Sequence, residues 1–220
     1  MQETIQKQGT SVLNGILEIS EKSKSKIVAL LSGGIDSAVM VAKLSMKYKV
    51  YGLFIDYGQL TVTSDHEAAC KIAKYYSIPL MSLQVSEFSL IAQSLLTGGI
   101  QSKVVPARNI FLVSLAAAYA ITIGAKYVAY GANLDDSQDF PDCRLAFTTE
   151  LNHALDLGYG ISLLMPMQSQ SKREIVIEAR LLGVPLELTH SCYVSDVPCQ
   201  QCDACKQRKI ALETKQEAMQ

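Results

Sequence analysis

The stretch Leu31-Ser32-Gly33-Gly34-Ile35-Asp36-Ser37-Ala38-Val39 decides the fold. The apolar run Lys26–Leu31 leads into it and predicts a buried parallel strand, and the periodic run Ala38–Tyr48 that follows predicts a helix. Between them, the two glycines can adopt positive φ and let backbone N–H groups come close to a ligand. The first N–H groups of a helix have no partner within it, and the helix dipole adds positive charge there. The stretch therefore predicts a site for a phosphate or a pyrophosphate.

A simpler interpretation of this stretch is a structural turn in which Asp36 or Ser37 caps the helix. The full Ser-Gly-Gly-x-Asp-Ser string is more specific, and it lacks the features of the Walker loop and of the dinucleotide fingerprint. It resembles the pyrophosphate loop of ATP-pyrophosphatases, which adenylate an oxygen and let a nitrogen or sulfur nucleophile replace it. The resemblance implies that ATP binds to the loop and the start of its helix, at Leu31, Ser32, Gly33, Gly34, Ile35, Asp36, Ser37, Ala38, Val39, Met40 and Val41.

The composition of the 220-residue chain fits one α/β domain with a substantial core, since 49% of the residues are hydrophobic. A net charge of -1 argues against bulk binding of nucleic acid. The longest uncharged stretch, Asn109–Ala125, contains polar residues and is shorter than the roughly 20 apolar residues of a membrane span. The N-terminus has no apolar signal region, and the first arginine is Arg108. We therefore expect a cytoplasmic protein without a membrane segment.

Strand and helix patterns alternate along the rest of the chain. The further predicted elements are strands at 49–56, 80–85, 126–130 and 161–165 and helices at 61–77, 110–123, 145–157, 172–182 and 206–218. This alternation indicates βαβ units with right-handed crossovers. We expect an α/β fold, an open parallel sheet of about five strands with helices on both faces, followed by a zinc-binding segment.

Three regions follow from this pattern: a helical extension and linker at 1–25, an ATP-binding domain at 26–188, and a cysteine segment with a helix at 189–220. The extension packs on the domain or on a partner subunit, unless it is a disordered or expression-derived tail. Its apolar stripe and the terminal helix suggest a homodimer. The weakly patterned stretch 87–105 is a candidate lid, and Asn109 is a candidate cap for the helix after it.

Ligands of open parallel sheets bind at the carboxyl ends of the strands. The segments that follow the predicted strands include the Ser32 loop, Asp56–Gln59, Gly131–Arg144 and Pro166–Lys172. We therefore expect these four segments to converge on one site.

Four cysteines crowd into one short segment, Cys192-x6-Cys199-x2-Cys202-x2-Cys205. In a cytosolic enzyme such a cluster predicts a metal site rather than disulfides. Four thiolates suit one tetrahedral Zn²⁺ and leave no open position, so the metal would be structural. An iron–sulfur cluster or a redox pair is the alternative. His190, two residues before the first ligand, is either incidental or a support for the site.

Further motifs join the loop and the cysteines in a fixed order. They are DYGQ at 56–59, VPARN at 105–109, PDCR at 141–144 and SCY at 191–193. Together, over Lys26–Ala211, they closely resemble the 7-cyano-7-deazaguanine synthase family, QueC. The resemblance implies an adenine nucleotide alpha hydrolase-like fold and a ligase that uses ATP and Mg²⁺. Its implied reaction converts 7-carboxy-7-deazaguanine and ammonia to 7-cyano-7-deazaguanine for queuosine biosynthesis.

The implied chemistry gives three charged residues catalytic roles. Asp36 would hold Mg²⁺ or order the loop, because a metal removes the repulsion between a carboxylate and a triphosphate. Arg108 and Lys172 would neutralise the phosphates or the charge that develops during the reaction. The alternative for both is a surface cation.

Four polar residues are candidate substrate contacts, together with Arg108. Asp142 can accept from the N–H edge of a guanine-like base, and Arg144 can pair with a carboxylate in a bidentate manner. The alternative is that the loop of these two residues caps a helix. Asp56 and Gln59 follow the second strand, where this superfamily usually places adenosine.

The sequence also departs from the family pattern. Gln138, Asp139 and Phe140 stand where the family usually has Ser-Gly-Tyr, and Ala107 stands where it usually has Gly. These changes leave ATP use intact and bear on the substrate. A divergent relative that activates another carboxylate is one alternative, a tRNA-modifying ATP-pyrophosphatase is a second, and a non-enzymatic zinc scaffold is a third.

Overall fold

The computed structural model describes residues 24–99 and 102–213, and most of the 1–25 extension lies outside these ranges. The strands in the described residues are β1 (Lys26–Leu30), β2 (Lys49–Asp56), β3 (Leu80–Gln84), β4 (Tyr127–Ala129) and β5 (Ser162–Leu164). They form one sheet in the order β3-β2-β1-β4-β5, and every neighbouring pair is parallel. The predicted open sheet of five parallel strands is confirmed.

Helices connect these strands, as the alternating pattern predicted. They are α2 (Ile35–Ser45), α3 (Val62–Tyr75), α4 (Phe88–Ile91), α5 (Arg108–Ile123), α6 (Asp136–Asp139), α7 (Leu145–Tyr159), α8 (Lys172–Leu181) and α9 (Asp203–Glu213), with short 3-10 turns η1 (Leu95–Thr97), η2 (Pro141–Cys143) and η3 (Leu186–Leu188). The helix predicted at Ala38–Tyr48 is α2, which begins and ends three residues earlier. It begins at Ile35, directly after the second loop glycine, Gly34.

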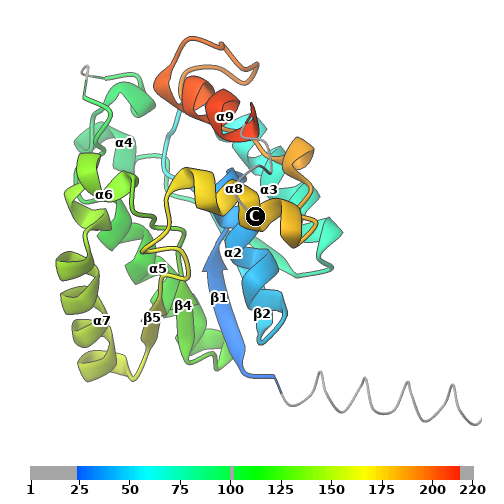
Figure 1. Ribbon diagram of the computed structural model, residues 1–220. Helices are drawn as coiled ribbons and strands as arrows, with labels where there is room; N and C mark the ends of the chain where they lie inside the picture. The colour runs from blue at the N-terminus through cyan, green and yellow to red at the C-terminus, as the bar shows by residue number, and fades with distance from the viewer. Residues whose placement is uncertain (1–23, 100–101, 214–220) are drawn as a thin grey trace, which may run out of the picture.

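Helices cover both faces of the sheet (Figure 1). Successive side chains of β1 point to opposite faces, so Ile27 and Ala29 share a core with residues of α2, α3 and α8. Val28 points the other way and packs with residues of α5 and α7. Both faces of the central strand are buried, which explains why its residues from Ile27 to Leu30 are all apolar rather than alternating.

The start of α5 differs from the sequence prediction. Ala107, in the left-handed region with φ 55°, is the residue before the helix, and Asn109 lies buried inside its first turn. The Asn109 backbone N–H donates to Asp142 Oδ2 (3.3 Å), so a carboxylate from a distant segment satisfies this helix end. The prediction that Asn109 caps α5 is wrong, because a contact between segments replaces the local cap.

The stretch predicted as a lid is partly helical and packs against the domain. It contains α4 and η1, and Ser94 and Thr97 form a reciprocal capping box at the latter. Leu96 and Val105 share a small core with Tyr57, which follows β2. The segment therefore covers the end of β2 next to the loop.

Gly33 is the tightest point of the loop between β1 and α2. Its φ is +85°, and a Cβ placed there would lie 2.4 Å from the Asp65 carbonyl oxygen and 2.9 Å from the Ala68 Cβ. The backbone of α3 therefore occupies the space that a side chain would need.

Gly33→Ala should lower the free energy of unfolding by about 3 kcal/mol, because strain in the left-handed region adds to a steric clash. Gly124→Ala is the matched control: φ is +67° there, and nothing lies within 4 Å of the added Cβ. Strain alone should cost the control about 1 kcal/mol. Urea unfolding of both variants measures the difference, and equal losses would show that contact with α3 does not constrain the loop.

Candidate functional site

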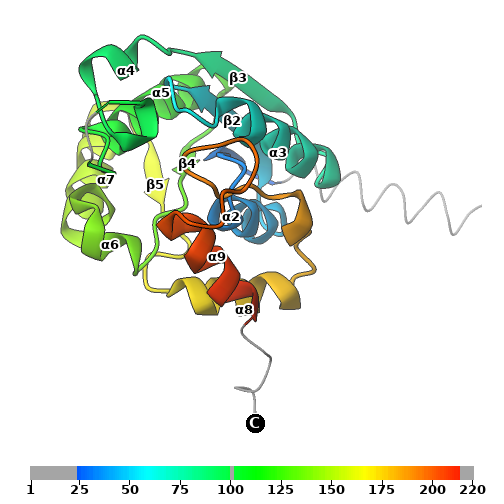
Figure 2. The same ribbon diagram turned by 90° about the horizontal axis from the view of Figure 1, so that it is seen from above.

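A cavity lies between the carboxyl ends of the strands and α9. Figure 2 looks down on this end of the domain, where α9 lies near α8. Each of the four segments expected to converge contributes a lining residue: Ser32, Gln59, Asp136 and Lys172. The remaining lining residues come from the same segments, from η1, from the starts of α3 and α5, from the 190–193 segment, and from α8 and α9. The site is therefore built from parts of the chain that are widely separated in sequence.

The loop before α2 presents the helix N-terminus without a side-chain cap. Gly34 is the residue before the helix, and no side chain caps it. The Ser37 hydroxyl donates to the Gly34 carbonyl (3.0 Å), and the Ser32 hydroxyl donates to Ser37 Oγ (3.2 Å). The interpretation in which Asp36 or Ser37 caps α2 is wrong. The uncapped helix N-terminus lies beside the cavity, where it would favour an anion.

Asp36 belongs to a compact group of charges at the base of the cavity. Lys172 Nζ lies 3.6 Å from Asp36 Oδ2 and 3.1 Å from Asp136 Oδ1. The Asn133 amide donates to both carboxylates, at 3.2 Å and 2.8 Å. Burial raises the pKa of Asp36, and Lys172 opposes that rise. Burial disfavours the charged form of Lys172, but the two carboxylates outweigh it and raise its pKa.

Arg108 stands at the first position of α5 and also lines the cavity. Its Nε donates to Asn109 Oδ1 (3.1 Å), which orients the guanidinium. Burial disfavours its charge, but Tyr57 and Asp142 nearby raise its pKa. Arg108 and Lys172 therefore bring two fixed positive charges to the same cavity from opposite halves of the chain.

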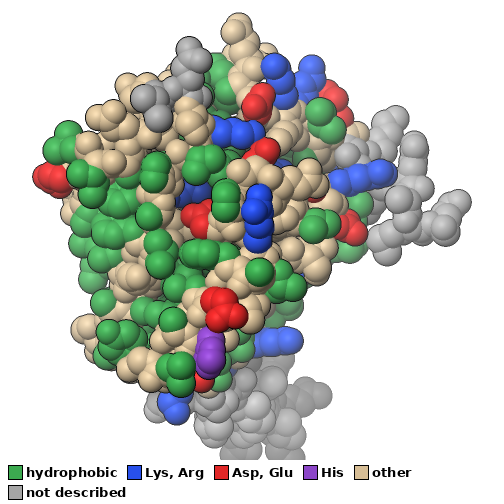
Figure 3. Space-filling model, turned by 90° about the vertical axis from the view of Figure 1, so that its left-hand side faces the viewer, with side chains coloured by type: hydrophobic (Ala, Val, Ile, Leu, Met, Phe, Trp, Pro, Cys, Tyr) green, Lys and Arg blue, Asp and Glu red, His purple; other side chains and the backbone are tan. Residues whose placement is uncertain are grey.

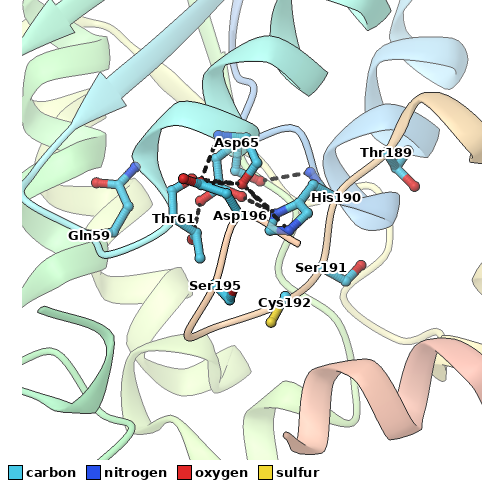
Figure 4. Close-up of polar contacts among 12 residues, drawn as sticks. Gln59, Thr61, Asp65, Thr189, His190, Ser191, Cys192, Ser195 and Asp196 are labelled. Atoms are coloured by element: carbon cyan, nitrogen blue, oxygen red, sulfur yellow. Dashed lines mark hydrogen bonds and ion pairs between the residues drawn. The ribbon is translucent and has the colours of Figure 1, made fainter. Parts of the chain in front are cut away.

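A network of polar residues joins the loop to α3 and to the 190–196 segment (Figure 4). His190 Nδ1 lies 2.8 Å from Asp65 Oδ1, and Asp65 also accepts from the Thr61 hydroxyl (2.8 Å). The His190 backbone N–H donates to the Gly33 carbonyl (2.9 Å). His190 is 9% exposed, so the predicted alternative of an incidental histidine does not describe it.

The four C-terminal cysteines form a cluster that could hold a metal ion. The Sγ atoms of Cys192, Cys199, Cys202 and Cys205 all lie within 4.8 Å of one another. The Cys202 N–H donates to Cys199 Sγ (3.3 Å), and backbone N–H donors lower the pKa of Cys199 to about 6. None of these thiols is in a disulfide. A single tetrahedral ion with four thiolates fits this spacing.

Comparison with known proteins places the chain in a family. The family described as "Queuosine biosynthesis protein QueC" matches residues 26–216. The chain belongs to the QueC family. The 7-cyano-7-deazaguanine synthase of Xylella fastidiosa is 39% identical over 204 residues, covering 83% of this chain and 88% of that protein. The Methanothermobacter thermautotrophicus synthase is 31% identical over 209 residues, covering 86% and 94%.

A solved structure supports the fold of this QueC chain. It is the U34-tRNA thiolase NcsA from Methanococcus maripaludis with its 4Fe-4S cluster, with a TM-score of 0.56 and 18% identity. The match covers 85% of this chain and 63% of the thiolase, less than two thirds of its length.

Within the described residues, no helix is both long and apolar enough to cross a membrane.

The structure divides the loop residues assigned to ATP into two groups. Ser32, Gly34, Ile35 and Asp36 line the cavity. The others are buried beneath it: Leu31, Gly33, Ser37, Ala38, Val39, Met40 and Val41.

The residues assigned to substrate also differ in their positions. Gln59 lines the cavity but is 7% exposed, because its amide bonds to the backbone of Tyr57 and Ile55. Asp56 Oδ1 accepts from the Gly58 N–H (2.9 Å).

Asp142 and Arg144 are not among the residues that line the cavity. Asp142 caps α5, and Arg144 Nε donates to the Ser137 carbonyl (3.3 Å) at the surface. The bond from the Asn109 N–H to Asp142 agrees with the alternative stated from the sequence, in which the loop of Asp142 and Arg144 caps a helix. Roles of both residues toward the substrate stay a prediction.

The sequence analysis assigned no role to four residues of the QueC chain that line the cavity, although one of them, Tyr193, belongs to the SCY motif. Asp65, Asp136, Tyr193 and Arg208 line the cavity but stand outside the motif positions assigned to ligand. An acidic residue in the first turn of a helix after a strand, as at Asp65 and Asp136, is the one local signal that could have indicated two of them.

Lys172→Met should lower the free energy of unfolding by about 2 kcal/mol at pH 7, because it leaves two partly buried carboxylates without a cation. The pKa of Asp36 should then rise further. A carboxyl group whose pKa is higher in the folded than in the unfolded state destabilises the fold as the pH rises through the range between the two pKa values. The loss in free energy of unfolding of Lys172→Met should therefore shrink toward pH 4.

Urea unfolding of wild type and variant at pH 4.5 and pH 7 measures this deficit. The control is Lys71→Met, whose pair with Glu67 (3.3 Å) is exposed, and it should change stability by less than about 0.5 kcal/mol. A Lys172→Met deficit that is the same at both pH values would contradict the proposed charge balance.

Proposed function

We propose that this chain is a 7-cyano-7-deazaguanine synthase. It converts 7-carboxy-7-deazaguanine and ammonia to the nitrile with ATP, for queuosine or related deazapurine biosynthesis. The convergence of the uncapped loop, Lys172 and Arg108 on one cavity is the observation that carries the proposal. Relatives of that name align with 83% or more of the chain in the two cases described above, which supports the choice of substrate.

The reaction requires two activations of the same carbon. A carboxylate is a poor electrophile, so ATP first converts it to a mixed anhydride with AMP, which is a good leaving group. Ammonia displaces AMP to give the amide. A second ATP then activates the amide oxygen, which leaves as part of AMP while the nitrogen loses its protons, and the nitrile forms. One phosphate site can serve both steps, because the two oxygens occupy the same place.

The residues of the cavity fit this chemistry. The loop from Ser32 to Gly34 and the N-terminus of α2 bind phosphates through backbone N–H groups. Arg108 and Lys172 stabilise the negative charge of the phosphates as the oxygen is activated. Asp36 and Asp136 offer two carboxylates side by side that would hold Mg²⁺, which shields them from the triphosphate.

The purified protein with ATP, ammonium and 7-carboxy-7-deazaguanine should produce the amide and then the nitrile, as mass spectrometry can detect. Asp36→Ala should lower kcat by about 100-fold, because it removes a charge that organises the phosphate site. Lys71→Met, remote from the cavity, should retain full activity. Absence of both products from the wild-type reaction would reject the substrate, and full activity of Asp36→Ala would reject the role of that residue.

We further propose that the four-cysteine cluster holds one structural Zn²⁺ per chain. Four thiolates within 4.8 Å of one another leave no open coordination position, so the ion would do no chemistry. A four-iron cluster needs wider spacing, because iron and sulfide ions lie between its thiolates. The ion would instead fix the loop that connects His190 to α9.

Elemental analysis of the purified protein should find one equivalent of zinc, and the solution should have no visible absorbance. Cys202→Ser should lose the ion and unfold at lower urea concentration, because a structural ion contributes to folding stability. Cys70→Ser, at an exposed cysteine outside the cluster, should retain both zinc and stability. Iron with visible absorbance would contradict the assignment.

The homodimer and the cytoplasmic location stay predictions of this proposal. One side of the molecule supports self-association, because hydrophobic side chains gather there (Figure 3). α5 and α7 carry exposed large hydrophobic residues, namely Ile110, Ile121, Leu145, Leu157 and Tyr159. Apolar surface of this kind commonly marks a protein interface.

A further inference from the structure

Arg208 is a cation of the cavity that has no role in the reaction described above. It lies on α9, three residues after Cys205, and its side chain lines the cavity. Nη1 donates to Thr189 Oγ1 (2.6 Å) and Ser191 Oγ (3.2 Å), and Nη2 donates to the Leu186 carbonyl (2.8 Å). These three acceptors are neutral, so they hold the guanidinium in place without balancing its charge.

The other cations of the cavity all have a carboxylate nearby. They are Lys172, which lies beside Asp36 and Asp136, and Arg108, which lies beside Asp142. Across residues 24–99 and 102–213, no carboxylate oxygen lies within 4.0 Å of the Arg208 guanidinium. Burial lowers the pKa of Arg208, and the neighbouring Cys205 thiol opposes that fall. An anionic ligand would supply the missing charge.

The residues that accept hydrogen bonds from Arg208 belong to a segment that contacts the phosphate loop. Thr189 and Ser191 flank His190, whose N–H donates to the Gly33 carbonyl (2.9 Å). The His190 carbonyl oxygen lies 3.7 Å from the position of a Cβ on Gly34. The segment that anchors the guanidinium is therefore in contact with the loop itself.

We propose that Arg208 binds the phosphate oxygens of ATP, together with the loop from Ser32 to Ser37. This inference rests on the proposed function, since it requires ATP in the cavity. Three of the five guanidinium N–H groups bond to protein, which leaves two for charged hydrogen bonds to phosphate. Because α9 begins between Cys202 and Cys205, the cysteine segment determines where Arg208 lies in the cavity.

Equilibrium binding of ATP and of adenosine, measured by calorimetry, tests the assignment. Arg208→Gln should raise the Kd of ATP about tenfold, because a charge-assisted hydrogen bond is lost, and should leave the Kd of adenosine unchanged. Its ATP affinity should also depend less on salt than that of wild type. Arg208→Lys keeps the charge and should retain much of the ATP affinity.

Lys209→Gln is the matched control, because Lys209 is the adjacent cation and its ion pair with Glu213 (3.9 Å) is exposed. It should bind ATP as wild type does. Metal content should be unchanged in all three variants.

Several outcomes would overturn the inference. Equal weakening of ATP and adenosine by both Arg208 variants would indicate that Arg208 only holds the 186–191 segment. Unchanged ATP binding by Arg208→Gln, or a loss that affects only the KM of the carboxylate substrate, would also reject it. Failure of the wild-type chain to bind ATP would reject the proposed function and this inference together.

Discussion

The contact between Gly33 and the backbone of α3 fixes the shape of the phosphate loop, and the site depends on that shape. The Asp65 carbonyl fills the space beside Gly33, and the His190 N–H holds the Gly33 carbonyl from the other side. The loop is thus confined by α3, which follows it after α2 and β2, and by a segment more than 150 residues away along the chain. Glycine is required at this position by packing as much as by its positive φ.

The C-terminal segment contributes to the site through the position of its residues. Cys192 and Cys199 bracket the loop that carries Asp196, whose carboxylate accepts from the Ser64 N–H (3.1 Å) and hydroxyl (2.9 Å). The same segment carries His190 on one side of the cysteines and α9 on the other. An ion bound by the four thiols would therefore restrain α3, the phosphate loop and one wall of the cavity at once.

The sequence predicts the sheet well, because its strands are short apolar runs whose burial depends on local pattern. Lys49–Asp56 was predicted with the boundaries that the structure has. Prediction was poorer wherever a distant contact decides a position. Asn109 has the side chain of a helix cap, yet Asp142, 33 residues away, satisfies that helix end. Arg208 shows the same limit, since only the fold reveals that, among the residues the structure describes, no carboxylate oxygen lies within 4.0 Å of its guanidinium.

The departures from the family pattern lie at the rim of the site and form contacts of their own. Asp139 Oδ2 lies 2.6 Å from Lys103 Nζ, and the same ammonium lies 5.9 Å from the centre of the Phe140 ring. Neither Asp139 nor Phe140 is among the residues that line the cavity. A salt bridge and a cation–π contact between two surface segments explain these residues without any contact to ligand. The departures at these two positions are therefore accounted for by contacts between surface segments, and both side chains stay outside the lining of the cavity.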